Sequence, residues 1–325
     1  MEEKRSTPPQ EFLVVILATK SGLGRDTDIQ ILPSLIEIKG QPLLIHQIVN
    51  GVKSGFSDFI IVYEEGDEDV QKCVKVAQEN AKEFFKLTKI RFSSVSHDVS
   101  QKSASMLQSI APLLTTDFIV IEGNVAFNFP LFRLVDMHKA RKAACTVVLK
   151  DRGEKGVSKD AIANLIGFCE DSSRLVVWLP ESSQYSIPDE VLLEFPCIQL
   201  STSLEAMMVF IMSTKIMPFI AAQTDMSFGS ISFDIVPFLV SKQPLNLTFP
   251  ADEESDEEQS GSSSSQIIIH SDLTESDKEK APQPISTYGF FVQKDFCERI
   301  TSQASLKLVK NVQEKSKEPL FTLLP

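Results

Sequence analysis

The sequence predicts an α/β protein whose mostly parallel sheet is covered by helices on both faces. Continuous apolar runs at 12–18, 58–63 and 117–121 are typical of strands that are buried on both faces. Segments of helical length separate these runs, so strand and helix alternate along the first half of the chain. Hydrophobic residues make up 42% of the 325 residues, which is enough for a sizeable core.

The elements of the first half follow from local signals. Pro42 suits a first helical turn, so a helix is expected to begin there, and Gly55 is expected to close it. The residues at 89–95 alternate as a strand does, and those at 100–114 carry a small, apolar helical face. The expected strands are 12–18, 58–63, 89–95, 117–121 and 145–150, and the expected helices are 42–52, 68–85, 100–114 and 131–143.

The second half has a different pattern. A hairpin is expected from 166 to 179, turning at Asp171-Ser-Ser. A helix over 232–241 would contain Pro237, which is expected in its first turn or at a kink because proline is costly inside a helix. The remaining expected elements are strands at 207–213 and 287–292 and helices at 215–222 and 302–313.

The negative charge of the chain is concentrated in one segment. The net charge is −12, and residues 252–280 contribute ten acidic and two basic residues to it. This serine-rich, acidic composition cannot offset the entropy of ordering, so a disordered insertion is predicted at 251–285. The predicted organisation is a disordered N-terminus (1–10), one domain (11–250 plus 286–296), the insertion, and a C-terminal helix and tail (297–325).

Several classes of protein are excluded by composition. The globular part has no basic stripe, which argues against direct binding of nucleic acid. The five cysteines are widely spaced and odd in number, as expected of reduced thiols, and the scattered histidines show no zinc site. The N-terminus lacks the apolar core of a signal peptide, and no apolar run is long enough to span a membrane. A cytosolic protein without membrane association is expected.

A glycine-bearing loop follows the first buried strand. Gly22 and Gly24 could turn backbone N–H groups towards phosphates, and Arg25 could neutralise phosphate charge. Two glycines after a strand also serve as an ordinary tight turn. These three residues are therefore the candidate nucleotide-binding loop, with a simple turn as the alternative.

A second feature is the end of the buried strand at 117–121, where Gly123 and Asn124 follow. The layout of 12–44 together with 117–130 resembles the nucleotidyltransferase family that makes nucleotide sugars, which has a Rossmann-like, GT-A-like fold. That family reads Leu-Ala-Gly-Gly-x-Gly-Thr-Arg, then Pro-Lys-Pro-Leu, and ends its second strand in Gly-Asp. The corresponding stretches here are 17–25, 32–36 and 121–124.

The resemblance includes three departures. The loop has lost glycines, Pro33 or Ser34 stands where the family has a phosphate-contacting lysine, and Asn124 takes the place of the metal-binding aspartate. An amide is a poor substitute for a carboxylate on Mg²⁺. We therefore expect no catalytic residue, no metal and no cofactor in this site, and a pseudo-nucleotidyltransferase rather than an enzyme.

More specific segments resemble the gamma-subunit family of eukaryotic translation initiation factor 2B. They are Asp117-Phe-Ile-Val-Ile-Glu-Gly-Asn-Val with 131–150, the Pro237 segment at 229–243 followed by the acidic insertion, and Tyr288-Gly-Phe-Phe-Val with 297–306. The hexapeptide repeats of the family's left-handed β-helix are absent from the sequence. The resemblance implies a subunit of the guanine-nucleotide exchange complex. Its expected partners are the other subunits, especially epsilon, and initiation factor 2.

Two alternatives remain open on the sequence. One is a sugar-nucleotide pyrophosphorylase, active or regulatory, in which Asp98, Asp117 or Asp234 would have to replace the missing metal ligand. The latter two are more typical of capping or surface roles. The other alternative is a nucleotide sensor that keeps the loop without the chemistry.

Overall fold

A computed structural model of the chain describes residues 12–21, 28–153, 164–180, 186–195, 197–221, 228–243 and 285–315. The predicted N-terminal segment, almost all of the predicted acidic insertion and residues 316–325 lie outside these ranges.

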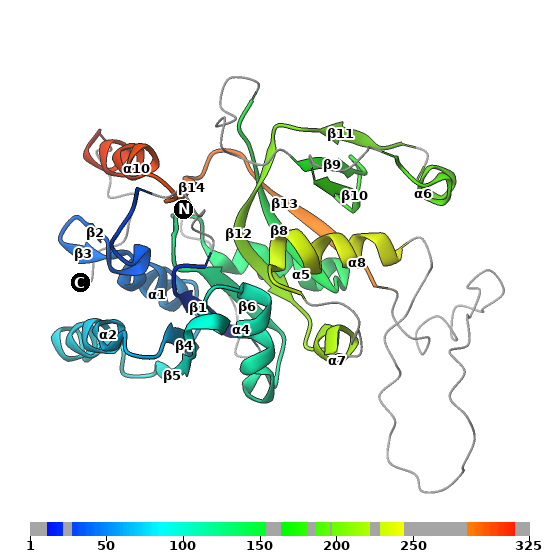
Figure 1. The fold of residues 1–325 in the computed structure, drawn as a ribbon. Helices are drawn as coiled ribbons and strands as arrows, with labels where there is room; N and C mark the ends of the chain where they lie inside the picture. Colours follow the sequence, from blue (N-terminus) through cyan, green and yellow to red (C-terminus); the bar gives the residue numbers. More distant parts are fainter. Residues whose placement is uncertain are drawn as a thin grey trace, which may run out of the picture.

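The centre of the molecule is a seven-stranded sheet in the order β13-β8-β12-β6-β1-β4-β5 (Figure 1). All neighbouring pairs are parallel except those of β12, which runs antiparallel to β6 and to β8. The predicted mostly parallel sheet is therefore confirmed. The strands are β1 (Leu13–Ala18), β4 (Asp58–Glu64), β5 (Lys89–Val95), β6 (Phe118–Glu122), β8 (Cys145–Asp151), β12 (Leu204–Met212) and β13 (Thr287–Val292).

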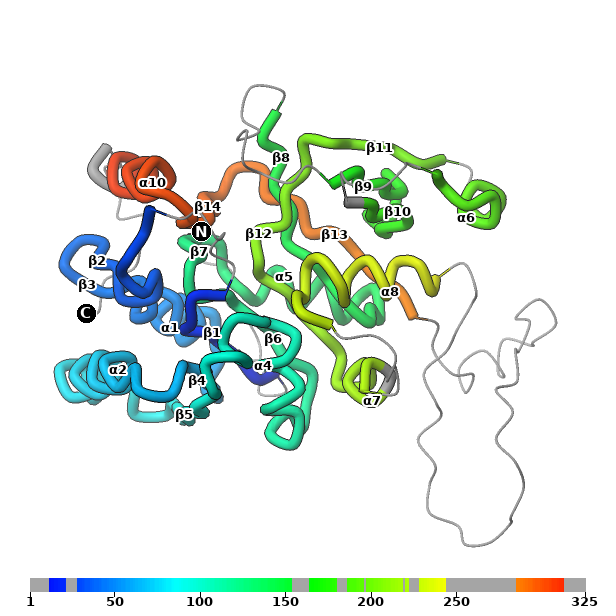
Figure 2. Tube along the Cα trace, in the orientation of Figure 1, coloured from blue at the N-terminus to red at the C-terminus, as the bar shows by residue number. Residues whose placement is uncertain are grey.

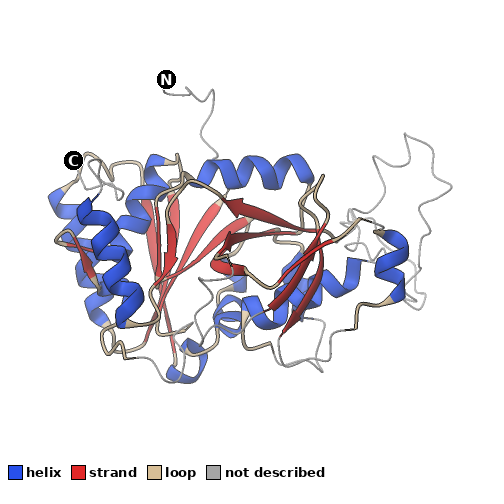
Figure 3. Cartoon of the chain, turned by 90° about the horizontal axis from the view of Figure 1, so that it is seen from above, coloured by secondary structure: helices blue, strands red, loops and turns tan. Residues whose placement is uncertain are grey.

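Helices lie on both sides of this sheet, as predicted (Figure 3). Strand β1 shows why both faces must be covered, because all six of its apolar side chains are buried. These side chains belong to one large core with those of β4, β6 and β12. The helices of this layer are α1 (Leu43–Lys53), α2 (Glu68–Asn80), α3 (His97–Ser100), α4 (Ser103–Ser109), α5 (Leu131–Arg141), α7 (Ile216–Ala221) and α8 (Val236–Lys242), with 3₁₀ turns η1 (Pro33–Leu35) and η2 (Ala111–Leu113).

Two expected helices differ from the structure. The helix expected over 68–85 ends at Asn80, and the chain turns so that Phe85 enters the core. The helix expected over 100–114 is divided into α3, α4 and η2, because Lys102 adopts an extended conformation between α3 and α4. In both segments tertiary packing overrides local helix propensity.

A smaller antiparallel sheet, in the order β10-β9-β11, stands beside the main one. The predicted hairpin is confirmed, and Ser173 supports its turn in a left-handed conformation with φ of 61°. The elements of this second lobe are β9 (Asn164–Phe168), β10 (Leu175–Pro180), α6 (Asp189–Glu194) and β11 (Gln199–Ser201).

The Pro237 segment is helical in two stages. A π-helical turn, η3 (Ile231–Ile235), leads directly into α8, and Pro237 lies in the first turn of α8 as predicted. The missing N–H of proline costs little at this position. Gln243 follows α8 and is buried against β10 and β13.

After β13 the C-terminal segment runs back across the molecule to the side where β2 (Glu37–Ile38) and β3 (Gln41–Pro42) lie (Figure 2). Strand β14 (Cys297–Arg299) pairs with β7 (Val125–Phe127), and α10 (Gln303–Lys315) follows. Ile300 and Val309 form a second apolar cluster with residues near the short hairpin of β2 and β3. Asp28 accepts a hydrogen bond from Gln303 N at 2.9 Å, so residues next to the glycine loop hold the start of α10.

The described residues include no helix that is long and apolar enough to cross a membrane. All five cysteines are free thiols, as the sequence predicts. Burial raises the pKa of Cys73 to about 11 and that of Cys145 to about 12.

Candidate functional site

The candidate site lies at the carboxyl ends of β1 and β6. Strand β1 is parallel to both β4 and β6, and the chain builds β4 and β5 on one side before it returns to β6 on the other. The connections therefore leave in opposite directions at these two strand ends. Such a switch point is where open α/β sheets bind ligands.

The residues that lead into the predicted nucleotide loop lie at this edge. Gly22, Gly24 and Arg25 lie outside the described residues, which resume at Asp28. The residues that enter the loop are described: Thr19 and Ser21 are buried, and the Thr19 hydroxyl donates to Ser21 Oγ at 3.0 Å. The Ser21 N–H donates to Thr19 Oγ1 at 3.2 Å. A short hydroxyl-lined turn thus begins the loop at the carboxyl end of β1.

Gly123 brings the ends of β1 and β6 into close contact. Its N–H donates to Leu17 O at 2.9 Å, and a Cβ atom at this position would lie 2.8 Å from the same oxygen. Only glycine fits such an approach. Gln47 supports the turn from α1 by donating to Glu122 O and Val125 O.

Asn124, the residue at the expected metal-aspartate position, is fully buried beside this turn. The backbone carbonyl oxygen of Asn124 accepts a hydrogen bond from Ile300 N at 2.8 Å. The C-terminal segment therefore packs directly against the end of β6. Asn124 follows β6 by two residues, and its contact with Ile300 was not anticipated from the sequence.

Ser34 stands at the position compared with the phosphate-contacting lysine. It lies in η1 and is fully buried, and a Cβ atom added to Gly123 would lie 3.2 Å from the Cβ of Ser34. Its hydroxyl has no hydrogen-bond partner among the described residues. The small side chain fills space behind the turn rather than extending towards a ligand.

Glu122 is the acidic residue of this site that sequence reasoning missed. It is the last residue of β6 and is only 2% exposed. Burial raises the pKa of its carboxyl group, while the charge of Arg299 and a hydrogen bond from Ser103 act in the opposite direction. The sequence did contain a signal for Glu122, because a carboxylate at the end of an otherwise apolar buried strand is unusual.

The three aspartates considered as replacement metal ligands lie elsewhere. Asp117 is at the amino end of β6 and accepts from Thr214 N at 3.0 Å. Asp234 accepts from Gly229 N and Ser230 N, both at 2.7 Å, and holds the entry to η3. Asp98 is exposed in α3. Asp117 therefore lies at the end of β6 opposite to Asn124, and the Asp234 carboxylate is bound to backbone N–H groups before η3.

The described residues at this edge do not fit a magnesium ion. Glu122 is a single carboxyl group whose pKa is raised, and Asn124 supplies only an amide. Within the described ranges, no group of three or more His, Cys, Asp or Glu side chains could hold a metal. Mg²⁺ prefers anionic oxygen ligands, which one carboxyl group with a raised pKa and one amide do not supply.

A second polar group lies at the neighbouring end of β4. Glu64 accepts from Ser100 Oγ at 2.6 Å and interacts with His97 Nδ1 at 2.7 Å. Burial raises the pKa of Glu64, but the hydrogen bonds from Ser100 and His97 prevail and lower it. His97 gains a raised pKa from the same contact. Lys20, after β1, also interacts with both groups.

Basic side chains cluster at the carboxyl end of β8, on the same edge of the sheet. Lys150, Arg152 and Arg299 contact the carboxylates of Glu205 and Glu298, and we refer to these five residues as the β8 charge cluster. It is the main group of partly buried cations that the described residues place at this edge.

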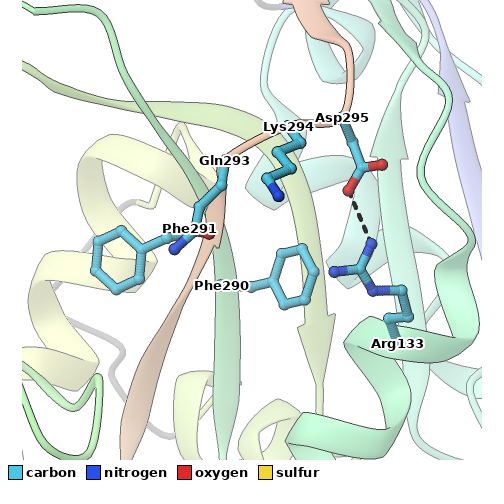
Figure 4. A pocket seen from close by; sticks show the side chains of 6 residues that line it. All are labelled: Arg133, Phe290, Phe291, Gln293, Lys294 and Asp295. Atoms are coloured by element: carbon cyan, nitrogen blue, oxygen red, sulfur yellow. Dashed lines mark hydrogen bonds and ion pairs between the residues drawn. The ribbon is translucent and has the colours of Figure 1, made fainter.

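A separate hollow of about 460 Å³ lies beside the outer strand β13. Phe290 and Arg133 lie on one side of this strand and Phe291 on the other (Figure 4). Arg133 pairs with Asp295 at 2.8 Å. The hollow is wide and open, and it does not include the residues of the switch point.

Comparison with solved structures places the chain among nucleotidyltransferase-like folds. A protein described as a glucose-1-phosphate thymidylyltransferase from Bacillus anthracis, in complex with sucrose, matches with a TM-score of 0.56 and 10% identity. The match covers 94% of this chain and 96% of that one. HddC from Yersinia pseudotuberculosis, complexed with GMP-PN, matches with a TM-score of 0.55 and 12% identity over 93% of this chain and 99% of that one. No protein-family model matches the chain.

The prediction that the chain is a pseudo-nucleotidyltransferase and no enzyme is contradicted by this comparison. The fold matched over nearly the whole chain includes a protein named as a thymidylyltransferase. The prediction took three departures from the family's motifs, in the loop, at the lysine and at Asn124, for the loss of the whole site. The structure keeps the switch point, the buried acid Glu122 and a set of cations at the same edge. At this level of identity the likeness establishes the architecture, and the chain has a nucleotidyltransferase-like fold.

Proposed function

We propose that this protein transfers a nucleotidyl group between a nucleoside triphosphate and a sugar phosphate. The observation that carries the proposal is the match of the complete architecture, over 94% of the chain, to a protein described as a sugar-phosphate nucleotidyltransferase. The switch point of the sheet supports it, because the carboxyl end of β1 and the turn after β6 are in contact there, and open α/β sheets bind ligands at such points.

The proposed reaction joins the sugar phosphate to the α-phosphate of the triphosphate and releases the β- and γ-phosphates together as pyrophosphate. An oxygen of the sugar phosphate attacks the α-phosphorus of the triphosphate, and the bond from that phosphorus to the bridging oxygen breaks. Pyrophosphate leaves with the electron pair of this bond, so negative charge develops on it. Phosphoryl chemistry of this kind depends on positioning and on neutralising charge.

The chain has cations at the edge where this charge would develop. Lys20 follows β1. Lys150 lies near the carboxyl end of β8, and Arg152 comes directly after this strand. Under the proposal, Lys20 interacts with the triphosphate and the β8 charge cluster with the sugar phosphate. Gly123 lets the two strand ends approach without a side chain between them.

Binding titrations test the first part of the proposal. Isothermal calorimetry with ATP, GTP, UTP and dTTP, followed by the matching nucleotide sugars, should reveal one preferred base. Gly24→Pro should weaken that binding, because proline lacks a backbone N–H and fixes φ. Silence with all ligands in folded protein would contradict the proposal.

A second candidate is a subunit of the translation initiation factor 2B exchange complex. The observation that favours it is the segment at 229–243, which resembles the gamma-subunit family and is placed by a specific set of contacts. Gln243, its last residue, accepts from Thr287 N and from Arg174 Nε, both at 3.0 Å. In this proposal the partners are the other subunits, especially epsilon, and initiation factor 2, in the cytosol.

Affinity purification separates the two candidates. The tagged chain would be recovered from its own cells at moderate salt, and its partners identified by mass spectrometry. Recovery of exchange-factor subunits and initiation factor 2 would favour the assembly role. Recovery of the chain alone, or with enzymes of nucleotide-sugar metabolism, would favour nucleotidyl transfer.

A further inference from the structure

The β8 charge cluster is held together by short contacts. Arg152 Nη1 donates to both oxygens of Glu298 at 2.7 and 2.9 Å, and its Nε donates to Glu205 at 2.6 Å. Lys150 Nζ lies 3.2 Å from Glu298 and donates to Cys297 O at 2.8 Å. Arg299 lies 3.4 Å from Glu205. One carboxylate, that of Glu298, is therefore gripped by two cations.

Among the described residues, the three basic side chains of the cluster form ion pairs with two carboxylates, those of Glu205 and Glu298. Glu122 also interacts with Arg299, but burial disfavours its charged form by raising its pKa. For Arg152, burial lowers the pKa, and Glu205 and Glu298 overcome this and raise it. The nearby cations would stabilise an additional anionic oxygen at this cluster.

Access to the cluster differs between its members. Glu298 is nearly inaccessible, with 4% of its side chain exposed, whereas Lys150 is 26% and Glu205 25% exposed. Lys150 is the most exposed of the three cations, since Arg152 is 17% and Arg299 14% exposed. Glu298 belongs to the three-residue strand β14.

We propose that Arg152, Lys150 and Arg299 form a binding site for a phosphate monoester, in which the Glu298 carboxylate holds the place of the phosphate in the ligand-free chain. Arg152 Nη1 contacts both oxygens of Glu298, and the same guanidinium nitrogen can donate to the oxygens of a phosphate. Lys150 supplies the point charge. When a phosphate binds, the Glu298 side chain turns away and the backbone of β14 keeps its pairing with β7.

The identity of the ligand as a sugar phosphate rests on the proposed function. The position supports it, because β8 ends at the same edge of the sheet as β1 and β6. A free phosphate ion and a nucleoside monophosphate share the same chemistry. The experiment therefore compares inorganic phosphate, glucose 1-phosphate and AMP as separate ligands.

The direct test is calorimetric titration of Glu298→Gln, which keeps the shape of the side chain and removes its charge. Phosphate should bind this variant about tenfold more tightly than the unmodified chain, because a charged competitor has been removed from charged donors. Adding Arg152→Ala to the variant should abolish the gain. An unchanged phosphate affinity in folded Glu298→Gln would overturn the proposal.

A matched control lies at the opposite edge of the sheet. Asp58 and Arg91 form a half-buried pair at 2.9 Å, and Asp58→Asn removes its carboxylate in the same way. This variant should show no gain in phosphate binding, and an equal gain there would overturn the proposal because any freed arginine would then suffice. Tighter binding of glucose 1-phosphate than of inorganic phosphate or AMP would identify the sugar phosphate as the ligand.

A second variant covers the case in which Glu298→Gln does not fold. Glu298→Asp keeps the charge but shortens the side chain by one methylene, which moves the carboxylate away from Arg152. Phosphate should again bind more tightly than to the unmodified chain. An unchanged phosphate affinity of this variant would also count against the proposed site. Calorimetry measures phosphate binding directly, so the test does not depend on catalytic activity. A chain that binds phosphate through Arg152 but never transfers a nucleotidyl group would refute the proposed function alone.

Discussion

Glu122 and Asn124 give the end of β6 its chemical character. The two residues flank Gly123, whose contact with Leu17 leaves no room for a side chain. Both are buried, and the pKa of the Glu122 carboxyl is raised because burial disfavours its charge. A buried acid whose charged form is disfavoured, beside an amide, suits hydrogen bonding to a ligand better than holding a cation.

Glu122 makes the stability of the protein depend on pH. Its pKa is raised in the folded state, so the folded chain holds a proton that the unfolded chain releases as pH rises above the ordinary glutamate range. Its contribution is therefore full at low pH and is lost as pH rises through the folded pKa. Glu122→Gln should raise the thermal midpoint at pH 8 and leave it nearly unchanged at pH 4. Equal effects at both pH values would contradict this assignment.

His138 acts in the opposite direction. Burial lowers its pKa to about 4, although the charge of Asp117 opposes the shift. The unfolded histidine takes up a proton near pH 6.5, so stability is lost as pH falls from about 6.5 towards 4, by about 3 kcal/mol from this group.

Urea denaturation at pH 7, 5.5 and 4 measures this contribution by comparing the chain with His138→Asn. The variant keeps a polar atom near Thr146, with which His138 Nδ1 interacts at 2.9 Å. The stability difference between the two proteins should shrink as the pH falls. A difference that stays constant would show that His138 is not buried in its neutral form.

At the scale of elements, Gln243 joins three parts of the fold. Its side chain donates to Leu175 O at 2.6 Å and accepts from Arg174 and Thr287. It thereby fixes the end of α8 to β10 and to the start of β13. Side chains that satisfy several buried backbone groups are costly to remove.

Gln243→Ala should lower the free energy of unfolding by about 2–4 kcal/mol, because it leaves several buried polar groups unpaired. Gln199 on the exposed strand β11 is a suitable control, and Gln199→Ala should change stability by less than about 0.5 kcal/mol. Chemical denaturation of the two variants gives both values. Equal effects would show that the Gln243 contacts are not structural.

Local sequence signals predicted most elements of the fold but not where helices end. The apolar runs indicated the buried strands, and Pro237 indicated the first turn of α8. The helix at 68–85 was predicted too long because the burial of Phe85, a tertiary contact, decides where the chain turns. The antiparallel direction of β12 was not predicted, because alternation along a strand carries no information on its direction.

The candidate site was predicted only in part. The structure places Asn124 in a buried turn shortly after β6, and a polar residue after a buried strand is visible in the sequence. Glu122 was missed because the prediction considered only position 124 as the acidic position of this turn. The β8 charge cluster was invisible because its members are separated by up to 149 positions, from Lys150 to Arg299, and meet only through β14.

For the whole molecule, the two ends of the segment from 244 to 284 are fixed to the same place. Gln243 contacts Thr287, and Ser286 O accepts hydrogen bonds from Ala144 N and Cys145 N. Closing this connection with a shorter linker should therefore disturb the fold little.

Replacing residues 252–284 with a short Gly-Ser linker should shift the thermal midpoint by less than about 5 °C. Calorimetry of the shortened and full chains measures the shift. As a control, a linker of the same composition but twice the length should behave alike. Loss of the cooperative transition would show that the segment contributes to the core.

The most direct test of the proposed function is the transfer reaction itself. Purified chain would be incubated with the preferred nucleoside triphosphate and a panel of sugar phosphates, with nucleotide sugar and pyrophosphate measured together by mass spectrometry and a coupled assay. We predict equal amounts of the two products for one sugar phosphate, and their loss in Arg152→Ala. Absence of both products from folded protein that binds the triphosphate would contradict nucleotidyl transfer.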